Sequence, residues 1–217
     1  MTKKSLEIYE HYKIMLSLRE HQMKVAAVAQ QICKSREEKL NIAEVVSACL
    51  IHDMGNIIKF DLNYFPQFLE PQGLKYWNAV KQEFEKKYGK EEHRATLLIA
   101  KEIGVSKKTI SYLSAIGFSK TTQNLSEKSF EKKICCYADQ RVGPFSILSV
   151  EERLKEGRER YKDRKDKSIA STWFEIRSRD LKQLEEQIFK NSKIQPFDIT
   201  DDSIKNYLRE LINFALV

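Results

Sequence analysis

Helical periodicity runs through almost the whole chain and constrains its fold more than any other feature. Apolar residues recur every three or four positions, as in Val25, Val28, Ala29 and Ile32. No stretch shows the sustained alternation of a β-strand followed by a hairpin turn. Only 7 glycines and 4 prolines interrupt the pattern in 217 residues. The sequence therefore predicts an all-α protein with about ten helices.

Glycines mark several of the predicted helix ends, and Gly89 and Gly104 stand where a C-terminal capping residue belongs. The segment 56–72 is looser, because it contains two prolines, and it is unusually aromatic. We expect this segment to pack down as the rim of a pocket. The expected helices cover 4–15, 20–34, 41–55, 74–88, 91–103, 107–116, 127–142, 150–165, 172–189 and 201–214.

Composition limits the class of protein. Hydrophobic residues make up 41% of the chain, which is enough for one core in a single domain. We expect that core within residues 1–165, with the helices of residues 166–217 packed on its side. The chain has no apolar run of about 18 residues and no apolar signal segment near Met1. These features predict a soluble, cytoplasmic protein that does not bind membranes.

The four cysteines fit a reducing compartment. Cys33, Cys49, Cys135 and Cys136 do not form a Cys-x-x-Cys motif, and each has apolar neighbours. We expect buried free thiols. The net charge of +7 indicates affinity for a phosphorylated partner, but basic and acidic residues are interleaved, with no basic stripe that contains aromatic residues. The pattern favours a small phosphorylated molecule over nucleic acid.

Three of the four histidines are predicted to face the core. His21, His52 and His93 each share a helix face with apolar residues three, four or seven positions away. A single inward histidine is usually a hydrogen-bonded core residue, whereas three that converge indicate a site. His11 stands in a polar stretch and is not part of this pattern.

Two acidic residues lie beside the same apolar faces. Asp53 follows His52 directly, and Asp139 lies in a largely apolar helix. Burial of an unpaired carboxylate is costly, and a bound cation removes that cost. The helix that carries His52 is expected to end near Gly55, where its dipole presents a negative end to a cation. These residues therefore predict a metal site.

The combined pattern resembles the HD-domain superfamily of metal-dependent phosphohydrolases. That family has a histidine, then a His-Asp doublet, then a distant aspartate, all on helices. Here these elements are His21, His52-Asp53 and Asp139, and the resemblance covers about residues 14–161. It implies an HD-domain-like helical bundle, with these four residues as metal ligands.

The ligand set suits one divalent transition metal. Two imidazoles and two carboxylates favour Mn²⁺, Fe²⁺, Co²⁺ or Ni²⁺, with Zn²⁺ and Mg²⁺ as alternatives. Binuclear branches of the family use two further histidines, and this chain offers only His93. No second histidine stands near residues 115–118, where the binuclear pattern would place one, so we expect one ion rather than two.

The resemblance implies hydrolysis of a phosphate ester of a nucleotide or a similar small molecule by metal-activated water. Asp53 or Asp139 is the candidate to take the proton of that water while it remains a ligand, and His93 is the candidate to protonate the leaving oxygen or to hold a phosphate. Asn56 stands where relatives often carry a catalytic Glu, His or Lys. Because Asn cannot act as a base, the residue that transfers the proton is left open.

Basic residues close to these elements in sequence are candidates for contact with the substrate phosphate. They are Arg19, Lys59, Arg94 and Arg141.

Two other functions remain open at this point. Some HD-domain relatives are di-iron oxygenases, and the chain could instead be a non-catalytic HD-fold binding module in which Asn56 marks lost activity. Dependence on iron and oxygen would indicate the oxygenase, and metal binding without turnover would indicate the binding module. The sequence predicts neither the exact substrate nor the oligomeric state.

Overall fold

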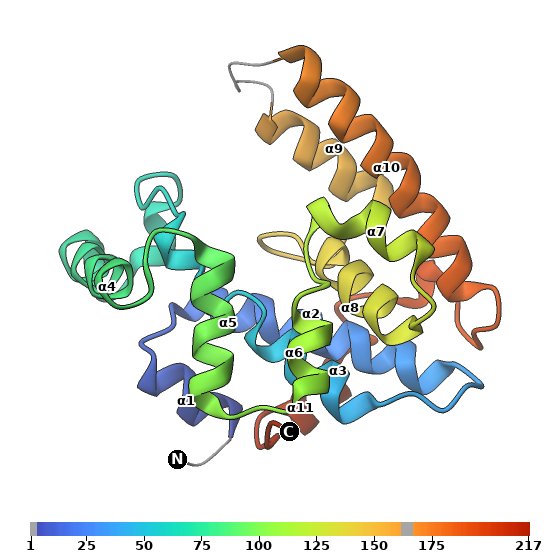
Figure 1. The fold of residues 1–217 in the computed structure, drawn as a ribbon, viewed down its shortest axis with the longest axis horizontal. Coiled ribbons are helices and arrows are strands. Elements are labelled where there is room, and N and C mark those ends of the chain that lie inside the picture. Colours follow the sequence, from blue (N-terminus) through green and yellow to red (C-terminus); the bar gives the residue numbers. More distant parts are fainter. Residues whose placement is uncertain (1–3, 162–166) are drawn as a thin grey trace.

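The structure is a computed structural model that describes the backbone of residues 4–161 and 167–217, and the side chains of residues 4–159 and 172–217. Within these residues the fold is all-α, as predicted (Figure 1). It contains eleven α-helices, four short 3-10 helices and no β-strand in the described part of the chain. The α-helices are α1 (Ser5–His11), α2 (Leu16–Ser35), α3 (Ile42–Ile51), α4 (Gly73–Tyr88), α5 (Glu92–Ile103), α6 (Lys107–Leu113), α7 (Thr121–Ser126), α8 (Phe130–Arg141), α9 (Val150–Tyr161), α10 (Lys167–Phe189) and α11 (Lys205–Leu211).

The core lies where α2, α3 and α8 pack against one another. Helix α3 is buried around most of its circumference, as expected for a helix whose residues are almost all apolar. Helix α2 presents small side chains such as Ala26 and Ala29, which are completely buried. Small residues let the helix axes approach closely, so these three helices form one tightly packed unit.

All four cysteines belong to this unit. Cys33 lies on α2, Cys49 lies on α3, and Cys135 and Cys136 lie on α8. Each is buried and free, as the sequence predicted. Burial, together with the nearby Asp139 carboxylate, raises the pKa of the Cys136 thiol to about 12. Such thiols are protonated and unreactive while the core is closed.

Several helix ends follow from local sequence. Gly104 adopts a left-handed conformation at the end of α5, with φ of 76°, and its N–H bonds to the carbonyls of Ala100 and Lys101. Ser106 caps α6 through its side chain, which accepts a bond from the Thr109 N–H. Asn41 precedes α3 as expected, but its side chain does not cap the helix.

Some helix boundaries differ from the sequence prediction. The expected break at 17–19 is helical, because α2 already begins at Leu16. The short helix α7 was not predicted, and α8 begins at Phe130 rather than near residue 127. Helix α11 is shorter than expected at both ends. The predicted domain boundary at 165/166 lies outside the described residues.

The C-terminal helices pack on different parts of the core. Helix α10 contacts α7 and α8, and α11 contacts α2. Helix α9 lies beside α10, and the pair extends away from the rest of the molecule at the upper right of Figure 1. None of the described helices is both long enough and apolar enough to cross a membrane.

The segment 56–72 contains two 3-10 helices, η1 (Asn56–Ile58) and η2 (Pro66–Leu69). Helix α4 holds it through side-chain hydrogen bonds to its backbone. The indole of Trp77 donates to the Leu69 carbonyl at 3.0 Å, and Lys81 donates to the Phe60 carbonyl at 2.8 Å. These bonds position the segment beside the site described next.

Candidate metal centre

One large cavity, of about 980 Å³, opens between the core helices and the segments that surround them. Its wall includes all four predicted metal ligands, which are His21, His52, Asp53 and Asp139. Residues from Asn56 to Leu69 line another part of it, so the prediction that the segment 56–72 borders the pocket is confirmed.

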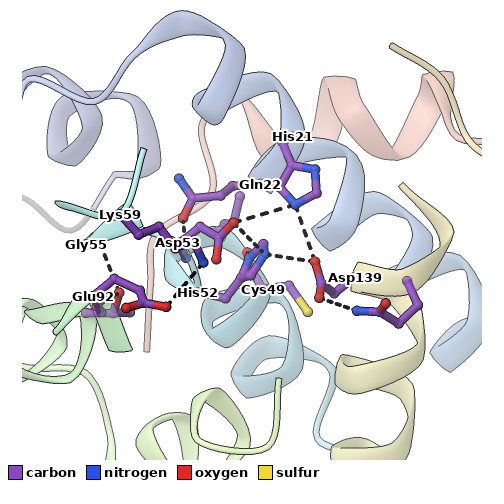
Figure 2. A network of polar contacts seen from close by, with 12 residues as sticks. His21, Gln22, Cys49, His52, Asp53, Gly55, Lys59, Glu92 and Asp139 are labelled. Atoms are coloured by element: carbon purple, nitrogen blue, oxygen red, sulfur yellow. Dashed lines mark hydrogen bonds and ion pairs between the residues drawn. The ribbon is translucent and has the colours of Figure 1, made fainter. Parts of the chain in front are cut away.

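The three core helices bring the predicted ligands together. His21 lies in the second turn of α2, and His52 is the residue at which α3 ends. Asp53 follows in the next turn, and Asp139 lies in the last turn of α8. Figure 2 shows these four side chains pointing toward one another. We call them the ligand cluster.

The distances between the imidazoles and the carboxylates of the ligand cluster match those of ligands around one ion. His21 Nε2 lies 3.8 Å from Asp53 Oδ2 and 3.4 Å from Asp139 Oδ1. The corresponding distances from His52 Nε2 are 3.5 and 3.3 Å. Two atoms that each lie about 2.1 Å from one ion are about 3.0 Å apart when adjacent in an octahedron and about 4.2 Å apart when opposite. All four distances fall in this range.

Three of these residues also satisfy a distance limit that applies to every pair of their ligand atoms. The ligand atoms of His21, His52 and Asp53 all lie within 4.8 Å of one another, so this group could hold a metal ion. No other group of three or more His, Cys, Asp or Glu side chains does so in the part of the chain that the structure describes. Asp139 contacts both rings and supplies a fourth donor.

The orientation of His52 is fixed by the backbone. Its Nδ1 lies 2.8 Å from the Cys49 carbonyl, which holds the proton on that nitrogen and turns Nε2 into the cavity. Nε2 is buried and has no hydrogen-bond partner in the structure, because the nearby carboxylate oxygens lie at ion-pair distance without hydrogen-bond geometry. A ligating histidine usually has this arrangement, with one ring nitrogen bonded to a carbonyl and the other left for the ion.

Two glutamines hold the acidic residues of the cluster, Gln22 through the Asp53 backbone and Gln140 through the Asp139 carboxylate, and the sequence gave no indication of either. Gln22 is completely buried, and its Oε1 accepts the Asp53 backbone N–H at 3.1 Å. Gln140 donates to Asp139 Oδ2 at 2.6 Å. The cluster is therefore supported by neighbours that fix the side chains before any ion binds.

The electrostatics of the cluster favour a positive charge. Burial lowers the pKa of His52, but the Asp53 and Asp139 carboxylates outweigh it and raise the pKa to about 10. Burial raises the pKa of Asp139, but the close contacts with the His21 and His52 rings bring it well below its usual value. The Asp53 and Asp139 carboxylates thus stabilise the protonated His52 imidazole, and a bound metal cation would replace that positive charge.

Gly55 joins the ligand cluster to α5. A Cβ at this position would lie 2.3 Å from the Glu92 carbonyl oxygen and 2.8 Å from the Ala95 Cβ. The Gly55 N–H donates to Thr96 Oγ1 at 2.9 Å, which in turn donates to the Glu92 carbonyl. Only glycine permits this close approach, which brings the first turn of α5 to the cavity.

His93 therefore lines the cavity, as Lys59 and Asn56 also do. His93 is half-buried and is not part of the ligand cluster. Lys59 is exposed, and its ammonium lies 3.5 Å from the Glu92 carboxylate. The structure leaves both residues available to a molecule in the cavity.

Arg141 does not face the cavity, although the sequence singled it out as a phosphate ligand. It is buried, and its guanidinium donates to the carbonyls of Leu148, Pro196 and Ile199 and to the Tyr137 hydroxyl. Its donors are engaged with the loops that follow α8 and α10. The prediction for Arg141 is wrong, because two residues of helix turn its side chain about 200° away from that of Asp139.

The sequence also predicted that Arg19 and Arg94 contact the substrate phosphate, and this prediction is wrong for both. The Arg19 guanidinium donates to the Ile14 carbonyl at 2.6 Å and to the Tyr9 carbonyl at 3.4 Å, so it joins α1 to α2. Arg94 lies on the exposed side of α5. Neither residue is part of the cavity wall.

Other cavity residues were not predicted. Phe118, Lys120, Arg153 and Trp173 line it from η3 (Phe118–Lys120), α9 and α10. They lie far from the ligands in sequence, and no local pattern marks them as neighbours. Comparisons with protein-family models, curated proteins and solved structures found no match to this chain.

Proposed function

We propose that this protein is a mononuclear metal-dependent phosphohydrolase of the HD type that acts on a small phosphate ester, with nucleotides the favoured substrates. The observation that carries the proposal is the ligand cluster itself. Two imidazoles and two carboxylates from three packed helices converge on the wall of a substrate-sized cavity. The unpartnered His52 Nε2 and the excess of carboxylate charge both suit a divalent cation.

His21, His52, Asp53 and Asp139 would hold the ion. The mixed nitrogen and oxygen donors suit Mn²⁺, Fe²⁺, Co²⁺ or Ni²⁺. When bound, such an ion polarises a phosphoryl oxygen and lowers the pKa of water. One ion per chain is expected, because His93 lies outside the cluster and the described residues contain no second group of this kind.

The chain's own residues would then orient and protonate the substrate. Asp53 is held through its backbone by Gln22 and could accept a proton from the attacking water. His93 faces the cavity from α5 and could donate a proton to the leaving oxygen. Lys59 could neutralise charge on the phosphate, since its ammonium is half exposed and only loosely paired.

Aromatic residues at the cavity edge support a nucleotide as the substrate. Phe65 and Phe68 lie within 6.3 and 5.8 Å of the Phe145 ring, measured between ring centroids. Tyr64 lies in the cavity wall and is 62% exposed, and Phe145 lies outside the wall and is 66% exposed. These rings could stack on a base while the phosphate lies at the ligand cluster.

The test is a phosphate-release screen over nucleoside phosphates with Mn²⁺, Fe²⁺, Co²⁺ and Ni²⁺. We expect release with at least one of these metals and its loss in Asp139→Asn, which keeps the shape of the side chain and removes its charge. Asp61→Asn is the matched control, because Asp61 is an exposed carboxylate in the same cavity wall. Equal activity in Asp139→Asn and the native protein would refute the proposal.

His93 has its own test. If it is the proton donor, His93→Ala should lower kcat by about 10²-fold with the metal content unchanged. His11→Ala is the control, because His11 is exposed and outside the cavity. Loss of metal from the His93 variant would instead make it a ligand. Oxygen consumption with iron would indicate an oxygenase, and stoichiometric metal binding with no turnover would indicate a binding module.

A further inference from the structure

The cavity has a second distinctive wall, formed by Phe118, Lys120, Arg153 and Trp173, which we call the cationic wall. Phe118 and Lys120 come from η3, Arg153 from α9 and Trp173 from α10. The Phe118 and Trp173 rings meet edge to face, with centroids 5.6 Å apart. This wall therefore combines two aromatic rings with two cations.

The two cations of the cationic wall lie on different elements from the acidic side chains of the cavity. Lys120 and Arg153 are the only charged cavity residues that η3, α9 and α10 contribute in the described part of the chain. The acidic lining residues come from elsewhere, and they are Asp53, Asp61, Glu91, Glu92 and Asp139.

Both cations of the wall have unused donors. No hydrogen bond or ion pair engages the Lys120 ammonium within the described residues. Arg153 pairs through one nitrogen with Glu156, but its Nε is buried and has no hydrogen-bond partner among the described residues. A guanidinium N–H without a partner is costly, and an anionic group bound at this wall would offer acceptors to Arg153 and Lys120.

The Phe118 and Trp173 rings restrict the kind of molecule that can carry the anionic group. The Arg177 guanidinium stacks on Trp173 at 4.0 Å from the ring centroid and holds the indole in place. Phe118 supports it from the side. A rigid aromatic surface next to two cations suits a phosphate attached to a sugar or base rather than a free apolar molecule.

We propose that the cationic wall is a subsite for a second phosphate group, so that the substrate is a nucleotide with two separate phosphates. The cavity volume of about 980 Å³ lies at the upper end of the range for small-molecule sites, which leaves room beyond a mononucleotide. The identity of the substrate rests on the proposed function, whereas binding at this wall is measured independently of turnover.

The experiment compares the binding of adenosine 5′-monophosphate and adenosine 3′,5′-bisphosphate by calorimetry. It uses the metal-free protein, where turnover does not interfere, and then the protein with Mn²⁺. Because a hydrogen bond to a charged group contributes about tenfold or more in affinity, the bisphosphate should bind about tenfold more tightly. Lys120→Gln and Arg153→Gln should each remove most of this preference and leave monophosphate affinity unchanged.

Lys128→Gln is the matched control, because it makes the same charge change at an exposed lysine outside the cavity. Lys120 has no side-chain partner among the described residues, so that variant tests the wall even if Arg153→Gln unfolds. Equal binding of the two nucleotides, or a preference that survives Lys120→Gln, would overturn the subsite. Tighter binding of the bisphosphate without any phosphate release would support the subsite and contradict the proposed hydrolase activity. Phosphate release with equal binding of the two nucleotides would support the hydrolase activity and contradict the subsite.

Discussion

The ligand cluster and the cationic wall face the same cavity but are built in opposite ways. The cluster lies on α2, α3 and α8, which pack against one another in the core. The cationic wall lies on a three-residue 3-10 helix and on α9 and α10, which extend away from the core (Figure 1). The cluster is thus fixed before anything binds, whereas changes in the wall disturb little else.

This difference separates two properties of a binding site. Packing against a core fixes the chemistry that the site can perform, because His52 and Asp53 cannot move without α3. Residues on peripheral helices adjust which molecule is bound. We therefore expect substitutions in the cluster to change metal binding, and substitutions in the wall to change only the preference among ligands.

The largest expected effect comes from the cluster. Asp53→Ala should weaken Mn²⁺ binding by at least about a hundredfold, since even residues behind metal ligands contribute about 10- to 100-fold. Helical content should be unchanged, because the Asp53 side chain is partly exposed. Calorimetric Mn²⁺ titration and circular dichroism measure the two properties. Asp61→Ala serves as the control, and equal metal binding in both variants would contradict the assignment.

Arg141 tests whether closeness to a ligand in sequence implies a role in the site. Arg141→Ala should lower the free energy of unfolding by about 3 kcal/mol, because it leaves buried carbonyls and the Tyr137 hydroxyl without a donor. Arg94→Ala should change it by less than about 0.5 kcal/mol, since Arg94 is exposed. Urea unfolding measures both. An Arg141 variant of native stability with a raised KM would restore its role in phosphate binding.

The sequence predicted the ligand cluster because helix periodicity fixes which residues share a face. His21 and Asp139 could be placed inward from their apolar neighbours alone, and inward residues on packed helices converge. Closeness to a ligand in sequence, which was the basis of the prediction for Arg19 and Arg141, failed. A long side chain can point in several directions from one backbone position. In both cases the guanidinium donates hydrogen bonds to backbone carbonyls of other segments.

The cationic wall could not be predicted for a different reason. Lys120 and Trp173 are more than fifty positions apart in sequence, and nothing local indicates that α10 packs beside α7. Asn41 shows a third kind of error. The predicted capping box failed because the Asn41 side chain donates to Glu131, on another helix, at 2.8 Å. Tertiary contacts overrode a local preference.

Gly55 tests how rigidly the cluster is joined to α5. Gly55→Ala should destabilise the protein by about 2 kcal/mol, because the added methyl group would overlap the Glu92 carbonyl and the strain must be relieved by movement of α5. That movement should also displace His93 and lower kcat. Thermal unfolding and kinetics measure the two effects. Wild-type stability with native kcat would show that the contact yields easily.

The smallest effect is expected behind the cationic wall. Gly157 lies inside α9, and a Cβ there would meet only the Phe174 ring, at 3.5 Å. Gly157→Ala should therefore raise stability by about 0.5 to 1 kcal/mol through better helix propensity. Adenosine bisphosphate affinity should not change. A loss of stability would mean that α9 packs too closely to accept a methyl group, against the view that this wall tolerates change.

The placement of the cysteines gives the protein an internal reporter. Cys33, Cys49, Cys135 and Cys136 lie on the same three helices that carry the ligand cluster, and all are buried. A thiol reagent can reach them only when those helices separate. The rate of labelling under native conditions thus measures how often the metal-holding unit opens, without any introduced probe. A bound ion should slow that labelling in proportion to its occupancy. The labelling rate of the native cysteines therefore measures ion binding without an optical signal from the ion.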